Sequence, residues 1–316
     1  MRAIVKGLCV ALAAGLALPA MAQSHRVWMV WAPKPDRLPP YTGTNRPIWR
    51  LADVLAMHKG QQSWSQDIID TPRYRVRYIQ MAPGGKTPVQ FYGDDRVVWI
   101  VWSGRIRFDI EGQKPLVAGK GFMVQVPARV RYSLQTVGNT PSLRLEVTHA
   151  GRLPLYPADN GAPQPPGRDG MHYVKASTPT APETFAAAAP NNLYIDFFKD
   201  IVAAHPNEGP KQPFFVADAD NMVRIIRGPG VPTPPPTNRG HFHVYNDEFW
   251  FIMEGRIDYL IEGEKLFTAD AGDVVYVPPG RWHRASYHAG GMDTRIAFNE
   301  RPDLLHNYGA EANGRQ

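Results

Sequence analysis

An internal repeat limits the folds open to this chain more than any other feature of its sequence. Residues 97–112 align without gaps with residues 248–263, at an offset of 151, and seven of the sixteen aligned pairs are identical. Two further pairs share this offset, Gly121 with Gly272 and Pro127 with Pro278. A repeat of this quality indicates two copies of one domain in tandem.

The composition and the hydrophobic pattern indicate that both copies are built of strands. The chain has 316 residues with 31 prolines and 28 glycines, which favour turns and short strands over long helices. The pattern predicts strands at 73–80, 98–102, 105–110, 122–126, 143–147 and 222–226. Helices are expected at 47–58 and 193–205, and residues 53–58 match residues 200–205 at an offset of 147. The predicted fold class is all-β with short peripheral helices.

A change in composition separates the two copies. Residues 151–190 contain eight prolines and few apolar side chains, which is typical of a linker. The sequence therefore predicts an N-terminal domain at 23–150, this linker, and a C-terminal domain at 191–316. The Trp- and Pro-rich residues 23–44 are interpreted as an extended lead-in, and the sequence leaves open which domain they cover.

Residues 1–22 have the pattern of a signal peptide. Arg2 and Lys6 precede an apolar segment at 7–19, and Ala20-Met21-Ala22 forms a cleavage pattern before Gln23. We therefore expect a periplasmic or secreted protein, exported unfolded by a Sec-type route. The apolar segment is too short to span a bilayer, so no membrane anchor is expected after cleavage. Cleavage also removes Cys9, the single cysteine, and with it any disulfide or thiolate metal ligand.

The charge pattern argues against a nucleic-acid partner. The formal charge is +6, but the basic residues occur in short alternations rather than in blocks. Residues 73–78 alternate arginine with apolar residues, as expected for a strand with one polar and one apolar face. We expect a small-molecule partner and no nucleic acid. Whether the protein forms a homo-oligomer is left open.

The second copy carries residues suited to a divalent transition metal. His241 and His243 alternate with Phe242, so on an extended strand both imidazoles point to one face. Glu248 follows, and His283 comes after a Pro-Pro-Gly turn. Imidazole nitrogens with one carboxylate form a typical transition-metal ligand set.

The first copy serves as an internal control for these four positions. Their repeat partners are Gln90, Tyr92, Val97 and Tyr132. All four differ from the candidate ligands, although the framework glycines and a tryptophan, Trp99 or Trp250, remain in both copies. The four residues therefore vary as a set, which indicates a site rather than a structural role.

The spacing of these residues resembles that of the cupin superfamily. The first cupin motif, G(X)5HXH(X)3-4E(X)6G, is matched from His241 to Gly255, except that Pro235 takes the place of its leading glycine. The second motif, G(X)5PXG(X)2H(X)3N, is matched from Gly272 to His283, with Tyr287 in place of the closing asparagine. The chain thus resembles a bicupin, with two tandem double-stranded β-helix or jelly-roll barrels, of which only the C-terminal one keeps the metal ligands.

The resemblance implies one metal bound by His241, His243, Glu248 and His283 inside the second barrel. This ligand set accepts Fe, Mn, Ni, Cu or Zn. Because a protein exported unfolded loads its metal outside the cytoplasm, we expect copper or zinc to bind at least as readily as iron or manganese.

Three functions are compatible with the sequence. The first is an oxidoreductase of the dioxygenase or oxidase type that acts on a small organic substrate, where the metal would activate O2 or polarise the substrate. In the resemblance, Glu248 also acts as a proton acceptor when it detaches from the metal. The alternatives are a redox-inert decarboxylase or lyase, and a non-catalytic periplasmic protein that binds metal or a small ligand.

Four further residues are candidates for a substrate pocket: Arg224, Trp250, Trp282 and Tyr287. Arg224 could hold a substrate carboxylate or form a structural ion pair, as its repeat partner Arg77 suggests. Trp250 is interpreted either as core or as a platform for substrate. Trp282 lies next to the ligand-bearing turn, either at the mouth of the pocket or on an exposed loop.

Overall fold

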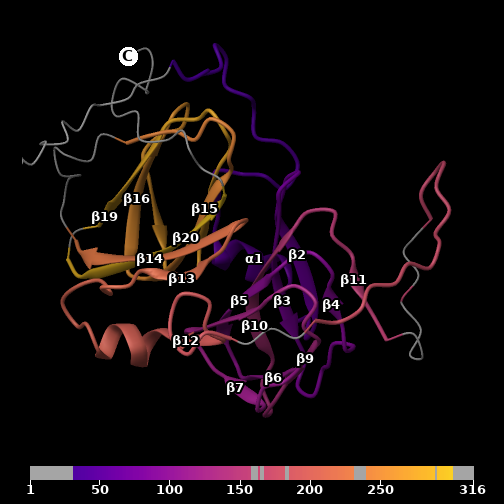
Figure 1. The fold of residues 1–316 in the computed structure, drawn as a ribbon. Coiled ribbons are helices and arrows are strands. Elements are labelled where there is room, and N and C mark those ends of the chain that lie inside the picture. The colour runs from indigo at the N-terminus through magenta and orange to yellow at the C-terminus, as the bar shows by residue number, and fades with distance from the viewer. Residues whose placement is uncertain are drawn as a thin grey trace, which may run out of the picture. The chain divides into compact units, whose positions relative to one another are not determined.

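The strands of this protein form two large sheets with corresponding strand orders, each built mainly from one half of the chain (Figure 1). The computed structural model describes residues 31–157, 163, 167–181, 185–230, 240–288 and 290–301. By their contacts, the described residues from Pro33 onward form one compact unit. The predicted signal peptide lies outside the described residues. None of the helices among the described residues is long and apolar enough to cross a membrane.

The first barrel consists of a large sheet and a small sheet that face each other. Its large sheet has the order β12-β8-β5-β10-β3-β2, and its small sheet has the order β7-β6-β9. The bounds are β2 (Trp64–Asp70), β3 (Tyr74–Met81), β5 (Val97–Ser103), β6 (Ile106–Ile110), β7 (Leu116–Ala118), β8 (Phe122–Val126), β9 (Tyr132–Thr136), β10 (Ser142–His149) and β12 (Tyr194–Asp196).

The second barrel repeats this arrangement strand by strand. Its large sheet has the order β1-β18-β15-β20-β14-β13, and its small sheet has the order β17-β16-β19. The bounds are β1 (Ile48–Trp49), β13 (Phe214–Ala217), β14 (Asn221–Pro229), β15 (Glu248–Glu254), β16 (Arg256–Ile261), β17 (Phe267–Asp270), β18 (Val274–Val277), β19 (His283–Tyr287) and β20 (Met292–Glu300). The predicted all-β fold with two tandem barrels is confirmed.

The central strands are apolar on both faces because each face is buried. On β15, Trp250 and Ile252 point into the second barrel, whereas Phe249 and Phe251 point to the back of the sheet. The backs of the two large sheets share one hydrophobic cluster, in which the ring centroids of Tyr74 and Phe249 are 5.1 Å apart. Sheets with two buried faces are typically encoded by continuous apolar runs, as in residues 97–101 and 249–253.

Each large sheet ends on a short strand that comes from the other half of the chain. Strand β1 pairs with β18, and β12 pairs with β8. A helix follows each of these strands, α1 (Leu51–Met57) after β1 and the π-helix η2 (Phe197–Ala203) after β12. The matching helical segments at 47–58 and 193–205 are therefore an exchanged pair. The predicted boundaries at 150 and 191 do not express this exchange.

The lead-in also contacts the second barrel. Lys34 forms an ion pair with Glu262 and donates a hydrogen bond to the Gly280 carbonyl at 2.9 Å. The Arg281 guanidinium lies 4.5 Å from the centre of the Tyr41 ring. This part of the lead-in thus covers the turn that carries His283. The sequence alone leaves open which barrel the lead-in contacts.

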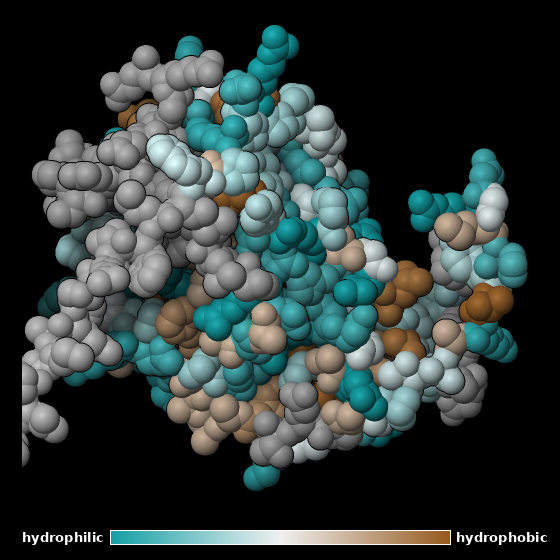
Figure 2. Space-filling model, turned by 45° about the horizontal axis from the view of Figure 1, so that its top comes forward, coloured by the Kyte–Doolittle hydropathy of each residue, from teal (hydrophilic) through white to brown (hydrophobic). Residues whose placement is uncertain are grey.

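The predicted linker is an extended excursion with little regular structure among its described residues. Strand β11 (Pro154–Leu155) pairs with β4 (Phe91–Tyr92). Figure 2 shows hydrophobic residues on this projecting segment, at the right of the view, and Met171 and Val174 are 62% and 75% exposed. Few of its side chains are buried, as its composition predicts.

A polar network joins the two barrels at one edge of their interface. His149 Nδ1 is 2.5 Å from Asp95 Oδ1, and Arg73 of the first barrel forms an ion pair with Glu300 of the second. Arg73 also donates a hydrogen bond to Asn246 Oδ1 at 3.1 Å. The first barrel therefore holds the loop that leads to Glu248.

Replacing Gly104 with alanine is expected to destabilise the protein strongly. Its φ is +68°, and an added Cβ would lie 2.4 Å from the Pro141 carbonyl oxygen. The left-handed conformation costs about 1–2 kcal/mol for a non-glycine residue, and the backbone clash adds to this, so we expect a loss of about 3 kcal/mol. Gly112→Ala is the control, because its φ is +74° but its Cβ would meet nothing within 4 Å. If urea unfolding showed equal losses of unfolding free energy for Gly104→Ala and Gly112→Ala, the predicted effect of the clash would be contradicted.

The His149–Asp95 pair should make the stability depend on pH. Burial lowers the pKa of His149, but the hydrogen bond and charge of Asp95 outweigh it and hold this pKa above its ordinary value. A raised folded-state pKa contributes stability that is complete below the unfolded pKa of about 6.5 and is lost as the pH rises through the folded value. Thermal unfolding between pH 6 and 9 should show this loss, and H149Q should flatten it. An unchanged slope in H149Q would contradict the assignment.

Candidate metal centre

The loop before β15 carries the two closely spaced histidines. The predicted strand at His241–His243 is reduced to a single bridge, in which His241 pairs with His283 through backbone hydrogen bonds of 3.0 and 2.8 Å. Gly240 has a φ of +73°, and a Cβ there would lie 2.3 Å from the Trp282 ring. The chain bends after His243, so a regular strand does not form, yet both imidazoles still reach the same place.

Glu248 is the first residue of β15. It pairs with Val277 on one side and Asn299 on the other, so its backbone is held in the middle of the large sheet. Its side chain lies on the same face as Trp250, two residues on, which packs in the barrel interior. The sheet thus directs this carboxylate into the second barrel.

His283 is the first residue of β19, on the opposite sheet. The preceding turn contains Gly280 with a φ of +77°, as the Pro-Pro-Gly sequence predicts. The Gly280 amide donates a hydrogen bond to the His243 carbonyl at 2.7 Å. This bond joins the turn that aims His283 to the loop that carries His243.

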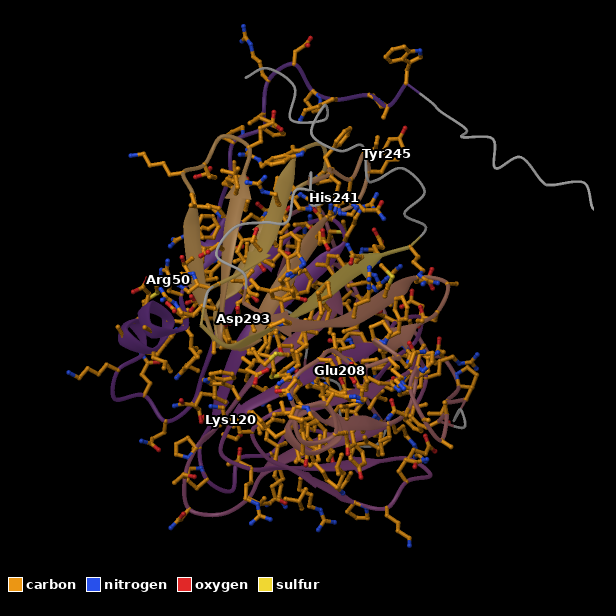
Figure 3. The ribbon with its side chains drawn as sticks, turned by 90° about the vertical axis from the view of Figure 1, so that its left-hand side faces the viewer. Arg50, Lys120, Glu208, His241, Tyr245 and Asp293 are labelled. Carbon is orange, nitrogen blue, oxygen red and sulfur yellow. The ribbon has the colours of Figure 1, made fainter. Side chains whose placement is uncertain are left out.

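The four side chains meet at one point inside the second barrel. One ligand atom from each of His241, His243, Glu248 and His283 lies within 4.8 Å of all the others. Glu248 Oε2 is 2.8 Å from His243 Nε2, 3.0 Å from His283 Nε2 and 3.8 Å from His241 Nε2. The side chain of His241 is 29% exposed, whereas the other three are buried. Figure 3 shows His241 and Tyr245 at the end of this barrel away from Asp293.

The hydrogen bonds of His283 leave a lone pair facing the carboxylate. Its Nδ1 is 3.1 Å from the Arg281 carbonyl oxygen, which can only accept, so Nδ1 carries a proton. Burial lowers the pKa of His283 to about 4, so at neutral pH its Nε2 is unprotonated. Although burial raises the pKa of Glu248, the neighbouring imidazoles, His243 foremost, hold it well below its ordinary value. Lone pairs of a neutral imidazole and a carboxylate therefore face each other at 3.0 Å.

A cation between these atoms would remove that repulsion. Three imidazole nitrogens and one carboxylate oxygen suit a first-row transition metal, and the carbonyl bond to Nδ1 is the usual support for a ligating histidine. The cluster could therefore hold one metal ion. Among the described residues, it is the single group of three or more His, Cys, Asp or Glu side chains placed to do so.

The first barrel keeps the same framework with different side chains. Gln90 and Tyr132 form the bridge that corresponds to His241 and His283, and Gln90 Nε2 donates to the Tyr132 hydroxyl at 3.0 Å. Val97 occupies the position of Glu248 and packs in the barrel core. The framework thus forms without the cluster.

Three of the candidate pocket residues surround the cluster or the adjoining interior. Trp250 is 2% exposed and packs in the core, with its ring 5.2 Å from that of His283. Trp282 is 3% exposed, so it is not an exposed loop residue. Tyr287 packs against the interior core, and the Arg295 guanidinium lies 5.6 Å from its ring. Their roles toward a substrate stay predictions.

Arg224 and a residue that the sequence reasoning missed share the interior face of the large sheet. Arg224 pairs with Ala297, and Ile226, which packs in the core, pairs with Arg295. Since side chains alternate along strands, Arg224 and Arg295 point to the same face as Ile226. The offset of 151 that aligns Arg295 with Arg144 was the available signal.

Removing one member of the cluster should abolish tight metal binding. Glu248→Gln removes the charge while keeping the shape, and His283→Ala removes a buried ligand. We expect each variant to lose at least about tenfold in zinc affinity by competition titration with a chelator, the minimum typical even of supporting residues. His205→Gln, a histidine far along the chain in the exchanged helical region, should bind zinc like the unmodified protein. Unchanged affinity in E248Q and H283A would contradict the site.

Comparisons with known proteins place this geometry in context. Residues 230–296, which contain all four clustered side chains, match the family model described as "Cupin domain". None of the curated proteins compared with this chain matches it in sequence.

Solved structures match over most of the chain. A variant of salicylate 1,2-dioxygenase from Pseudoaminobacter salicylatoxidans, in complex with gentisate, has a TM-score of 0.57 at 11% identity, and the match covers 82% of this chain and 84% of that chain. A second structure of that enzyme has a TM-score of 0.52 at 11% identity, with the same coverage of 82% and 84%. A variant of oxalate decarboxylase from Bacillus subtilis has a TM-score of 0.48 at 11% identity, covering 83% and 79%.

At these identities the likeness concerns the fold, and it extends over both barrels. The fold of this chain is therefore that of two tandem cupin barrels, and residues 230–296, where the four clustered side chains lie, match a cupin domain.

Proposed function

We propose that this protein is a metal-dependent enzyme, an oxidoreductase of the dioxygenase or oxidase type, that acts on a small organic molecule. The observation that carries the proposal is the convergence of three imidazoles on one buried carboxylate, in which His283 Nε2 lies 3.0 Å from Glu248 Oε2. Burying these imidazoles and this carboxylate with no ligand to compensate them would lower the stability of the fold. The fold match to a dioxygenase supports the reaction class at the level of analogy.

The residues of the site would divide the work between holding the metal and handling a proton. All three imidazoles would hold the metal, His243 and His283 from buried positions and the partly exposed His241 from the side of the entrance. A bound transition metal would supply Lewis acidity and, if it is redox-active, a place for O2. Glu248, ionised and within reach of all three imidazoles, would accept a proton from the substrate. The buried walls, including Trp250, would exclude water.

The proposal includes the metal and the compartment. Residues 1–22 have the composition of a signal peptide, which supports export to the periplasm or beyond. A protein that folds after export would take its metal from that compartment, where copper and zinc compete well for nitrogen and oxygen ligands. Its partner would be a small molecule, without nucleic acid or a membrane anchor.

Two other functions remain candidates. A redox-inert decarboxylase or lyase would use the same ligands with a metal that only polarises the substrate. A non-catalytic binding protein is favoured by one observation: the first barrel keeps the fold without the cluster, so a barrel of this kind persists without chemistry.

Metal analysis and electron paramagnetic resonance on protein from its native compartment should test the reaction class. We expect about one transition metal per chain, a mature N-terminus at Gln23, and O2 uptake with a member of a panel of phenols and small keto acids. The double variant H241A/H243A should lose both metal and O2 uptake, because two of the four ligands are gone.

The controls separate the alternatives. His205→Gln should keep metal and O2 uptake. A redox-silent metal with product formation would support the decarboxylase or lyase, and a bound metal without turnover would support the binding protein. A protein that holds only Mn or Fe would contradict the expectation for copper and zinc.

A further inference from the structure

The first barrel contains a buried carboxylate that lies among the N–H groups of three side chains. Glu146 is 8% exposed and forms an ion pair with Arg77. Its Oε2 accepts a hydrogen bond from Trp99 Nε1 at 2.8 Å and lies 3.7 Å from Arg144 Nη2. Burial raises the pKa of Glu146, but the charges of Arg77 and Arg144 hold it below its ordinary value. The first barrel thus places one acid of its own between its two interior arginines.

The second barrel keeps these donors in the same register but not the acid. In the first barrel, Glu146 lies opposite Trp99 and Arg77. In the second, Ala297 lies opposite the corresponding residues, Trp250 and Arg224. Arg144 comes two residues before Glu146, and Arg295 comes two residues before Ala297. A methyl group therefore stands where the first barrel has a carboxylate.

No acidic side chain among the described residues replaces the missing carboxylate. Neither Arg224 nor Arg295 forms an ion pair with a described residue, and the Nε atom of each is buried without a hydrogen-bond partner. Their guanidinium groups lie near aromatic rings, that of Arg224 5.3 Å from the centre of Phe214 and that of Arg295 5.6 Å from the centre of Tyr287. The alternative that Arg224 forms a structural ion pair like that of Arg77 is not supported.

Two unneutralised guanidinium groups on one inner face call for an anion. A partly buried charge without a partner is costly, and a carboxylate is the planar acceptor that matches guanidinium geometry. The two arginines are diagonal neighbours on adjacent strands, about 7–8 Å apart, so that one carboxylate could reach both guanidinium groups on the side of the small Ala297.

The position relative to the candidate metal limits the size of the ligand. Ala297 pairs with Trp250, and Trp250 follows Glu248 by two residues on the same face of β15. Two residues along a strand span about 7 Å. A small organic acid would reach from the arginines to the cluster.

We infer that the substrate of the second barrel carries a carboxylate, which binds between Arg224 and Arg295 in the place that Glu146 fills in the first barrel. This inference rests on the proposed function, because it names the substrate class of the same site. The first barrel supplies this carboxylate from its own chain, and the second would take it from a small acid in solution.

A pair of substitutions at Ala297 tests the charge without knowledge of the substrate. Ala297→Glu rebuilds the arrangement of the first barrel, and Ala297→Gln adds a side chain of the same shape without charge. If the arginines lack a counter-charge, A297E should unfold at a higher temperature than A297Q at pH 7. The inference is overturned if A297E is no more stable than A297Q.

Binding of small acids gives the second test. The probes are benzoate, 2-hydroxybenzoate and pyruvate, each paired with its neutral amide, titrated calorimetrically into zinc-loaded protein. At least one acid should bind more tightly than its amide, and R224Q and R295Q should each weaken it about tenfold or more. Arg256→Gln, an exposed arginine on β16, is the charge-matched control and should bind like the unmodified protein. Acids that bind no tighter than their amides overturn the inference.

A failure of this inference can be distinguished from a failure of the proposed function. Acid binding that depends on both arginines, in a protein without turnover, would retain the inference and reject the enzyme. Turnover of neutral molecules that R224Q leaves unchanged would retain the enzyme and overturn the inference.

Discussion

The contact between the backs of the two large sheets is the interaction on which the rest of the structure depends. Its hydrophobic cluster includes Tyr78 and Ile100 from the first barrel and Phe249 and Phe298 from the second. Burying such side chains is the main favourable term in folding, and it holds both sheets rigid from behind. The inner faces are thereby free to differ, because the barrel does not depend on them alone. The candidate metal centre occupies one of these inner faces.

The two inner faces solve the problem of buried polar groups in opposite ways. In the first barrel, Gln90 bonds to Tyr132 and Glu146 forms an ion pair with Arg77, so these four groups are paired within the chain. In the second, three imidazoles meet at the single carboxylate of Glu248, and Arg224 has no acidic partner among the described residues. A buried group that lacks a partner is destabilising by itself and therefore points to a ligand. The first barrel pairs these groups within its own chain, whereas in our proposal a ligand completes the second.

Much of this could be predicted from the sequence because a repeat encodes the fold twice. The offset of 151 aligned strands that the structure places in equivalent positions, and it separated the clustered side chains from the framework. Strand β2 was missed, since its sequence, WSQDIID, is polar where it faces solvent. Arg295 was missed because its partner Arg144 mattered only once Glu146 was seen beside it. The exchange of β1 and β12 depends on contacts between distant segments, which no local pattern reports.

That exchange bears on how the chain is made. Strand β1 leaves the ribosome before any strand of the sheet that it closes, and β12 is made after the first barrel's other strands. During synthesis, the edge strand β8 stays open until β12 emerges, and β1 stays without a partner until β18 emerges. Open edges invite pairing with other chains. If the chain were cut between the halves, each fragment would carry the edge strand that the other fragment needs. Neither half of the gene therefore encodes a complete barrel.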